Sequence, residues 1–299
     1  MVSAMALFVL TVVQAQVNFI PLWEEGKIPN STGVKVETTE VDQRVREVAM
    51  PGVYEFMPTS NLFTGTAVVI CPGGGYSYGS IYKEGYDIAK YFNTKGIAAY
   101  VLAYRIPQSK SVEVSYKAPL QDALRAIRMV RKLSQSWQRN TGKVGIMGFS
   151  AGGHLAATAG TMYMEDWANV GDELDALSCR PDFMALIYPV ISMGEITHMG
   201  SRMNLLGRDA GQDLIDKFSN EKHVTPQTPP TILIHAVNDS AVPVNNSILF
   251  MQAMKENRVP VAMHLFTTGG HGFGMQASGE LASWPGMVYD FLAATRMLQ

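Results

Sequence analysis

The sequence predicts an α/β fold with a doubly wound, mostly parallel sheet. Short apolar runs recur from about residue 65 onward, and segments with helical periodicity lie between them. The runs carry apolar side chains at consecutive positions, as do strands that are covered by helices on both faces. Regular alternation of such strands with helices is typical of βαβ units and therefore of a parallel sheet.

The individual elements follow from these patterns. We expect strands over residues 66–71, 97–104, 143–147, 183–190, 231–236 and 261–266. We expect helices over residues 84–92, 119–133, 153–162, 246–256 and 284–298, the second of which repeats apolar residues at helical spacing. Residues 16–64 are rich in turn-forming residues and contain two alternating pairs, Val34 with Val36 and Val41 with Val45. They predict a lead-in with antiparallel edge strands.

Length and charge restrict the class of protein. The chain has 299 residues and no evident internal repeat, which favours one domain over residues 16–299. Its 24 basic and 26 acidic side chains nearly balance, which argues against a nucleic-acid partner. Residues 191–228 interrupt the strand and helix alternation. We expect a small excursion over the carboxyl edge of the sheet, where open α/β folds place their ligand sites; a plain surface connection is the alternative.

The first fifteen residues form an apolar stretch that ends in Val13-Gln14-Ala15. This pattern is typical of a signal peptide with a cleavage site before Gln16, and it predicts export to the periplasm or the exterior. The stretch is short for a membrane span, so we expect no membrane association of the mature form. A buried N-terminal strand is the alternative.

Metal-binding patterns are absent from the sequence. It contains no CxxC or HExxH motif and no histidine and cysteine cluster, so we expect no metal site. The only cysteines are Cys71, which ends an expected strand, and Cys179, which precedes another, and both are expected to be small buried hydrophobes. The residues carry no indication of an oligomeric state.

A Gly-x-Ser-x-Gly motif, Gly148 to Gly152, follows the expected strand over 143–147 and precedes a helix. A sharp strand-to-helix turn of this kind exposes the serine hydroxyl, and only small neighbours tolerate it. Ser150 is therefore a candidate nucleophile. The motif by itself leaves a helix N-cap role for Ser150 open.

A nucleophilic serine requires a base, and six histidines are available. His271 stands between glycines just past the last expected strand, where its ring can reach the serine at a strand end. His154 follows Ser150 on the emerging helix and is expected to pack under the turn. The remaining four are His235 and His264 inside expected strands, and His198 and His223, which stay possible substrate contacts in the excursion.

An acidic residue must orient the imidazole of the base. Asp239 lies in the turn after the strand over 231–236, at the same edge as Ser150 and His271. The chain order Ser150, Asp239, His271 is the order found in α/β-hydrolases. Other aspartates suit structural or surface positions: Asp122 on a helix, and Asp182, Asp209, Asp213 and Asp216.

The glycine run after the first central strand supplies candidate oxyanion-hole donors. In Cys71-Pro72-Gly73-Gly74-Gly75-Tyr76, glycine amides can point into the site without obstruction. We expect the donors to be the Gly74, Gly75 and Ala151 amides. Nearby side chains could shape an acyl or sugar pocket, with plain packing as the alternative; these are Tyr76, Tyr78 and Glu84.

The chain resembles the secreted α/β-hydrolase carbohydrate esterases of the acetyl xylan esterase and feruloyl esterase type. The matching segments are CPGGGY (71–76), KEGYDIAKYF (83–92), YRIP (104–107), DALRAIRMVR (122–131), MGFSAGGHLA (147–156), TPPTILIHAVNDSAVPVNNS (228–247) and GGHGFG (269–274). The resemblance implies a serine esterase without a cofactor that removes small acyl groups from sugars such as xylan. It carries the triad over onto Ser150, Asp239 and His271.

The resemblance leaves the substrate open. Cys71-Pro72 precede the glycines where related lipases have histidine, which favours the carbohydrate-esterase branch. Acetyl and feruloyl esters both remain candidates. The alternatives are a general short-chain carboxylesterase, lipase or peptidase and, from another class, an inactive binding module with the hydrolase fold.

Overall fold

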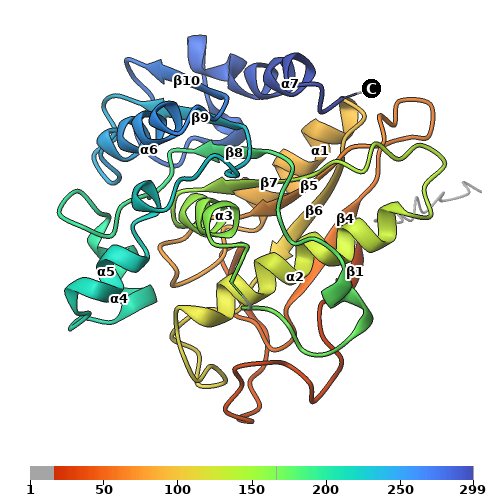
Figure 1. Cartoon of the computed structure of the whole chain (residues 1–299), viewed down its shortest axis with the longest axis vertical. Helices are drawn as coiled ribbons and strands as arrows, with labels where there is room; N and C mark the ends of the chain where they lie inside the picture. Colours follow the sequence, from red (N-terminus) through yellow and green to blue (C-terminus); the bar gives the residue numbers. More distant parts are fainter. Residues whose placement is uncertain (1–16, 166, 299) are drawn as a thin grey trace, which may run out of the picture.

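An eight-stranded sheet runs through the centre of the molecule in the order β1-β4-β6-β5-β7-β8-β9-β10. Figure 1 shows the computed structural model, which describes residues 17–165 and 167–298. The strands from β6 to β10 pair in parallel, and β4 pairs antiparallel with both β1 and β6. This arrangement confirms the predicted α/β fold with a doubly wound, mostly parallel sheet.

The parallel strands lie where the apolar runs predicted them. They are β5 (Ala67–Cys71), β6 (Ala98–Ala103), β7 (Val144–Phe149), β8 (Met184–Ile187), β9 (Thr231–Ala236) and β10 (Val261–Phe266). Every residue of the first five is buried, which explains their continuous apolar character. Strand β10 is only partly buried because it lies at the edge of the sheet.

Helices cover both faces of the sheet. Side chains of α2 (Lys117–Ser134), α3 (Ala151–Thr161) and α6 (Asn245–Glu256) share one core cluster with one face of the strands. Those of α1 (Asp87–Thr94) and α7 (Trp284–Ala294) share a second cluster with the opposite face. A π-helical turn, η1 (Tyr82–Tyr86), leads directly into α1. Both faces of the sheet are thus covered by helices.

The N-terminal lead-in contains the predicted antiparallel edge strands. Strands β1 (Asn18–Pro21) and β4 (Gly52–Phe56) extend the main sheet, and β2 (Thr39–Val41) with β3 (Arg44–Glu47) forms a separate hairpin. Val34 and Val36 lie outside every strand, so their alternation did not indicate one. Both are at least partly exposed and pair with no other strand, which removes the burial that normally produces such a pattern.

The segment over residues 191–228 contains short helices that the sequence patterns did not predict. They are α4 (Met199–Leu206), α5 (Gln212–Lys217) and the 3₁₀ turn η3 (Asn220–Lys222). Two further 3₁₀ turns, η4 (Gly274–Gln276) and η5 (Gly279–Ser283), precede α7, and η2 (Glu173–Ala176) precedes β8. Cys71 and Cys179 are both buried, as predicted. The expected signal peptide, residues 1–15, lies outside the described residues.

The parallel strands bring their carboxyl ends to one edge of the sheet. The segments that follow β5, β7, β8, β9 and β10 therefore meet there, although they are far apart in the chain. Open α/β sheets bind ligands at this edge. None of the helices in the described part of the chain combines the length and the apolar character that crossing a membrane requires.

Candidate active site

Ser150 occupies a sharp turn between β7 and α3. Its backbone φ of 55° and ψ of −120° fall in a region that non-glycine residues rarely adopt, so the turn is strained. The Ser150 amide donates to the Ile187 carbonyl at 3.1 Å, and its carbonyl accepts from the Val190 amide at 3.0 Å. These bonds tie the turn to the end of β8 and hold the hydroxyl at the edge of the sheet.

Two glycines make this turn possible. A Cβ on Gly148 would collide with the Gly152 carbonyl oxygen, and a Cβ on Gly152 would collide with the Cys71 carbonyl oxygen at the end of β5. The first contact lets α3 begin directly above β7, and the second lets α3 approach the neighbouring strand. The Gly-x-Ser-x-Gly spacing is therefore required by backbone packing on two sides.

Ser150, His271 and Asp239 form a continuous chain of hydrogen bonds. His271 Nε2 lies 2.9 Å from Ser150 Oγ, and His271 Nδ1 lies 2.7 Å from Asp239 Oδ2. An ionised aspartate can only accept, so Nδ1 carries the proton and Nε2 presents a lone pair to the serine hydroxyl. The arrangement can remove the hydroxyl proton from Ser150.

The Asp239 carboxylate lies in a buried, hydrogen-bonded environment. Burial alone would raise the pKa of this carboxyl, but hydrogen bonds from His235, His271 and the Val242 amide outweigh it and hold the pKa well below its usual range. The Ala241 and Val242 amides both donate to Oδ1 at 2.9 Å. Asp239 therefore stays ionised at neutral pH and can stabilise a protonated His271.

The glycine loop after β5 leaves two amides available. Gly73 donates its amide to Glu84 Oε2 at 2.9 Å, whereas Gly74 and Gly75 donate no hydrogen bond within the described part of the chain. Gly75 has a φ of 62°, which glycine adopts without strain. Ala151 begins α3, and the first amides of a helix lack an intrahelical acceptor. The described structure thus records no hydrogen bond that occupies any of the three expected donors.

Tyr76 is buried in the core, as the packing alternative predicts. The side chain is 1% exposed, and its hydroxyl lies 2.9 Å from His154 Nδ1. His154 itself is completely buried, and its Nε2 lies 2.8 Å from the Phe218 carbonyl. Burial lowers the pKa of His154 to about 4, so the ring is neutral and structural. This confirms that His154 packs under the turn.

Glu84 is also a packing residue and not a pocket residue. It is buried, and in addition to the Gly73 amide its carboxylate accepts from the Tyr188 hydroxyl at 2.8 Å. The Tyr188 hydroxyl in turn accepts from the Gly274 amide at 3.2 Å, and the Tyr188 ring packs edge-on against His271 with centroids 5.0 Å apart. The pair therefore joins the glycine loop after β5 to the loop that carries His271.

Tyr188 was not among the site residues predicted from the sequence. The residue directly follows β8 and adopts a φ of 38°, so it lies at the same edge of the sheet as the other site residues. Its position after an apolar run was the available signal. The apolar run continues past Tyr188 and Pro189 to Val190, so the predicted strand over residues 183–190 includes Tyr188, whereas β8 ends at Ile187.

Tyr78 remains a candidate for contact with a ligand. It is partly exposed, and the guanidinium groups of Arg44 and Arg46 lie 5.0 and 5.6 Å from its ring centroid. The hairpin that carries these arginines is fixed to the glycine loop by two hydrogen bonds between the backbones of Val45 and Gly79, at 2.7 and 3.0 Å. Part of the N-terminal lead-in thus flanks the candidate site.

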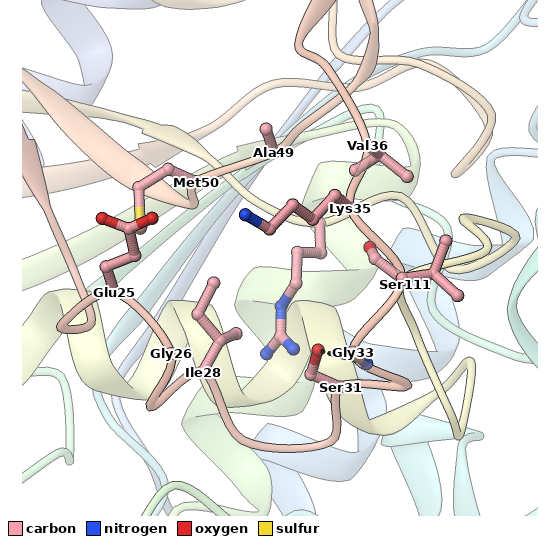
Figure 2. Close-up of a pocket in the computed structure, with 12 residues that line it drawn as sticks. Glu25, Gly26, Ile28, Ser31, Gly33, Lys35, Val36, Ala49, Met50 and Ser111 are labelled. Atoms are coloured by element: carbon pink, nitrogen blue, oxygen red, sulfur yellow. Dashed lines mark hydrogen bonds between the residues drawn. The ribbon is translucent and has the colours of Figure 1, made fainter.

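A separate cavity of about 640 Å³ lies against the N-terminal lead-in (Figure 2). Figure 2 shows Lys35 and Ile28 pointing into it, and the buried Arg105 forms part of the wall. None of the residues that line it belongs to the chain of hydrogen bonds at Ser150. Within residues 17–165 and 167–298, no group of histidine, cysteine and acidic side chains could hold a metal ion.

Comparison with known proteins agrees with this geometry. The BD-FAE family model matches residues 56–254, which is well over half of the chain. An endo-1,4-beta-xylanase B from Butyrivibrio fibrisolvens is 35% identical over 241 residues, and an acetylxylan esterase from Xylanibacter ruminicola is 38% identical over 216 residues. These alignments cover 81% and 71% of the chain but only 37% and 42% of the two relatives.

A solved structure matches over nearly the whole length of both proteins. It is the acetyl ester-xyloside bifunctional hydrolase from Caldicellulosiruptor lactoaceticus, with 34% identity and a TM-score of 0.82, covering 97% of this chain and 100% of the other. The family match and this structure confirm the resemblance seen in the motifs. The chain therefore belongs to the BD-FAE family and is an α/β-hydrolase of the carbohydrate esterase class.

Proposed function

We propose that the protein is a serine esterase that removes small acyl groups, acetyl first among them, from carbohydrate esters such as xylan. The observation that carries this proposal is the chain of hydrogen bonds from Ser150 through His271 to Asp239, with links of 2.9 and 2.7 Å. The acetyl and xylan parts are supported by what the names of the relatives state: an acetylxylan esterase and an acetyl ester-xyloside hydrolase.

Ester cleavage would begin with attack of Ser150 Oγ on the ester carbonyl carbon. His271 Nε2 takes the hydroxyl proton, and the ionised Asp239 stabilises the resulting imidazolium. The negative charge that develops on the carbonyl oxygen is held by the unoccupied Gly74, Gly75 and Ala151 amides. His271 then donates its proton to the departing sugar oxygen, which leaves as an alcohol.

Hydrolysis of the acyl-enzyme would repeat these steps with water. His271 Nε2 removes a proton from the water molecule, whose oxygen attacks the acyl carbon. Collapse of the second tetrahedral intermediate releases the carboxylic acid and returns the proton to Ser150 Oγ. These residues complete both halves of the reaction without a cofactor or metal ion.

The proposal is tested with purified protein and 4-nitrophenyl acetate, whose cleavage releases a coloured phenolate. We expect turnover by the wild type and its loss in Ser150→Ala, which removes the nucleophile without adding volume. Wild-type protein without turnover, or Ser150→Ala with the wild-type rate, would contradict the proposal. A panel of acetylated xylan, feruloyl esters and simple acetyl sugars then establishes whether feruloyl groups are also removed.

We also propose that residues 16–299 form one catalytic domain and that residues 1–15 direct its export. The apolar stretch and the Val13-Gln14-Ala15 ending support the second part. The test is N-terminal sequencing of protein recovered from the periplasm or medium of an expressing bacterium. We expect a start at Gln16; an intact N-terminus on cytoplasmic protein alone would contradict export.

A further inference from the structure

His198 caps the first helix of the excursion through one ring nitrogen. It directly precedes α4, and its Nδ1 lies 3.2 Å from the Ser201 amide nitrogen and 2.9 Å from Ser201 Oγ. An amide N–H can only donate, so Nδ1 must be the nitrogen with the lone pair. The proton of the neutral ring is therefore on Nε2, and the bonds at Nδ1 fix the orientation of the ring.

The ring lies beside the glycine loop that carries the proposed oxyanion donors. Asn204 Nδ2 of α4 donates to the Gly75 carbonyl oxygen at 2.8 Å, which fixes the helix to this loop. A Cβ built on Gly75 would lie 3.7 Å from His198 Cε1. Burial lowers the pKa of His198, and the charge of His271 lowers it further, whereas that of Asp239 raises it.

Nε2 of His198 has no partner among the described residues, although the ring is half-buried. A partly buried donor without an acceptor costs free energy unless water or a ligand satisfies it. His223 was the other possible substrate contact in the excursion, but its Nε2 lies 3.0 Å from the Asp216 carbonyl oxygen, so this nitrogen is already paired and offers no donor to a sugar.

We propose that His198 Nε2–H donates a hydrogen bond to a hydroxyl or ring oxygen of the sugar that carries the ester. This inference rests on the proposed function, which places the ester carbonyl between Ser150 and the Gly75 amide. With the alcohol part of the ester directed past this loop, its oxygens come next to the His198 donor. The fixed ring presents this donor without a further loss of side-chain freedom.

The choice of residue at this N-cap agrees with a role in recognition. Serine, threonine, asparagine and aspartate are the preferred caps, and each would satisfy the Ser201 amide. An aspartate here would add a negative charge beside the developing oxyanion and oppose it. Histidine caps the helix with one nitrogen and keeps a neutral donor on the other.

The test compares kcat/KM for an acetylated methyl xyloside with kcat/KM for 4-nitrophenyl acetate, which has no sugar oxygens. His198→Ser keeps a favoured cap and removes the donor, and His198→Phe keeps the ring and removes the donor. We expect the ratio of the two constants to fall about five- to tenfold in both variants, as loss of one hydrogen bond predicts. The control, His223→Ser, should keep the wild-type ratio.

The outcomes separate this inference from the proposed function. Wild-type protein that cleaves neither compound contradicts the proposed esterase and with it the role of His198. Wild-type cleavage of both compounds, together with a wild-type ratio in His198→Ser and His198→Phe, overturns the inference alone. Thermal unfolding of His198→Ser is measured alongside, and a cooperative transition close to that of the wild type shows that the capped helix is retained.

Discussion

Replacement of Tyr188 by phenylalanine tests the buried connection beneath the site. The change removes one hydroxyl and keeps the ring that packs on His271 and Phe273, with centroids 5.0 and 4.5 Å away. Two hydrogen bonds are lost, the one to Glu84 Oε1 and the one from the Gly274 amide. Hydrogen bonds to charged groups contribute about 1.5–3 kcal/mol and a buried unpaired amide costs about 1–3 kcal/mol. We expect the free energy of unfolding to fall by about 2–5 kcal/mol at pH 8.

The loss of stability should depend on pH in a defined direction. Burial raises the pKa of Glu84 above its ordinary 4.5, against the hydrogen bonds from Tyr188 and Gly73 and the charges of His271 and Lys83. A carboxyl whose pKa is raised in the folded protein stabilises it at low pH, and this contribution is lost as pH rises through the folded pKa. Without the Tyr188 hydroxyl the pKa of Glu84 rises further. The destabilisation by Tyr188→Phe should therefore be larger at pH 8 than near pH 4.5.

Urea unfolding at a series of pH values between 4.5 and 8 measures this effect. The matched control is Tyr91→Phe, because the Tyr91 hydroxyl makes no hydrogen bond that the described structure records and its ring is partly exposed. We expect the control to change stability by less than about 0.5 kcal/mol at every pH. Equal stability of Tyr188→Phe and the wild type at pH 8, or a difference that grows on acidification, would refute the reasoning.

Three further predictions concern other parts of the molecule. His271→Ala should lower kcat/KM for 4-nitrophenyl acetate by about 10⁴-fold or more with little change in stability. His154→Ala should mainly lower the midpoint of unfolding. Similar residual turnover in the two variants would argue against His271 as the base. Asp122→Asn should reduce the free energy of unfolding in urea by about 3–5 kcal/mol. The buried Arg105 guanidinium, which lies 2.9 Å from the Asp122 carboxylate in the wild type, would keep its charge and lose its charged partner. A loss below about 1 kcal/mol would contradict this prediction. Gly152→Ala should lower the free energy of unfolding by about 1–3 kcal/mol and also lower kcat. The new Cβ would push against the Cys71 and Pro72 carbonyl oxygens, next to the glycine loop that carries the expected oxyanion donors. An unchanged kcat would contradict the predicted link between this contact and catalysis.

Local sequence patterns predicted some elements of the fold and missed others. Strands such as β5 and β9 were found because both of their faces are buried, and this leaves a continuous apolar run in the sequence. Helices α4 and α5 were missed because they are short and their apolar residues form no clear stripe. Val34 and Val36 gave the opposite error, because they indicated a strand that is not formed. An alternating pair in an unpaired segment looks the same in the sequence as one in an edge strand.

Some residues of the candidate site could likewise be predicted from the sequence, and others could not. Ser150, Asp239 and His271 were predicted from sequence because each lies in the turn or loop that follows an apolar strand, and parallel strands bring their carboxyl ends to one edge. The same reasoning could not assign Tyr76 and Glu84, which lie near the site in the chain but turn their side chains into the core. The direction of a side chain in an irregular loop depends on its packing partners, and these come from distant segments.

The sequence by itself determined the order of the parallel strands and the longer helices, the strand-end positions of the three residues of the hydrogen-bonded chain, and the glycines that permit the turn at Ser150. Only the tertiary structure decided that Tyr188 and Glu84 join two loops beneath the site and that His198 lies beside Gly75. Steric and periodic constraints act between neighbours in the chain and so leave a local pattern. Contacts such as that between Asn204 and Gly75 join residues far apart in sequence and become visible only when the chain has folded.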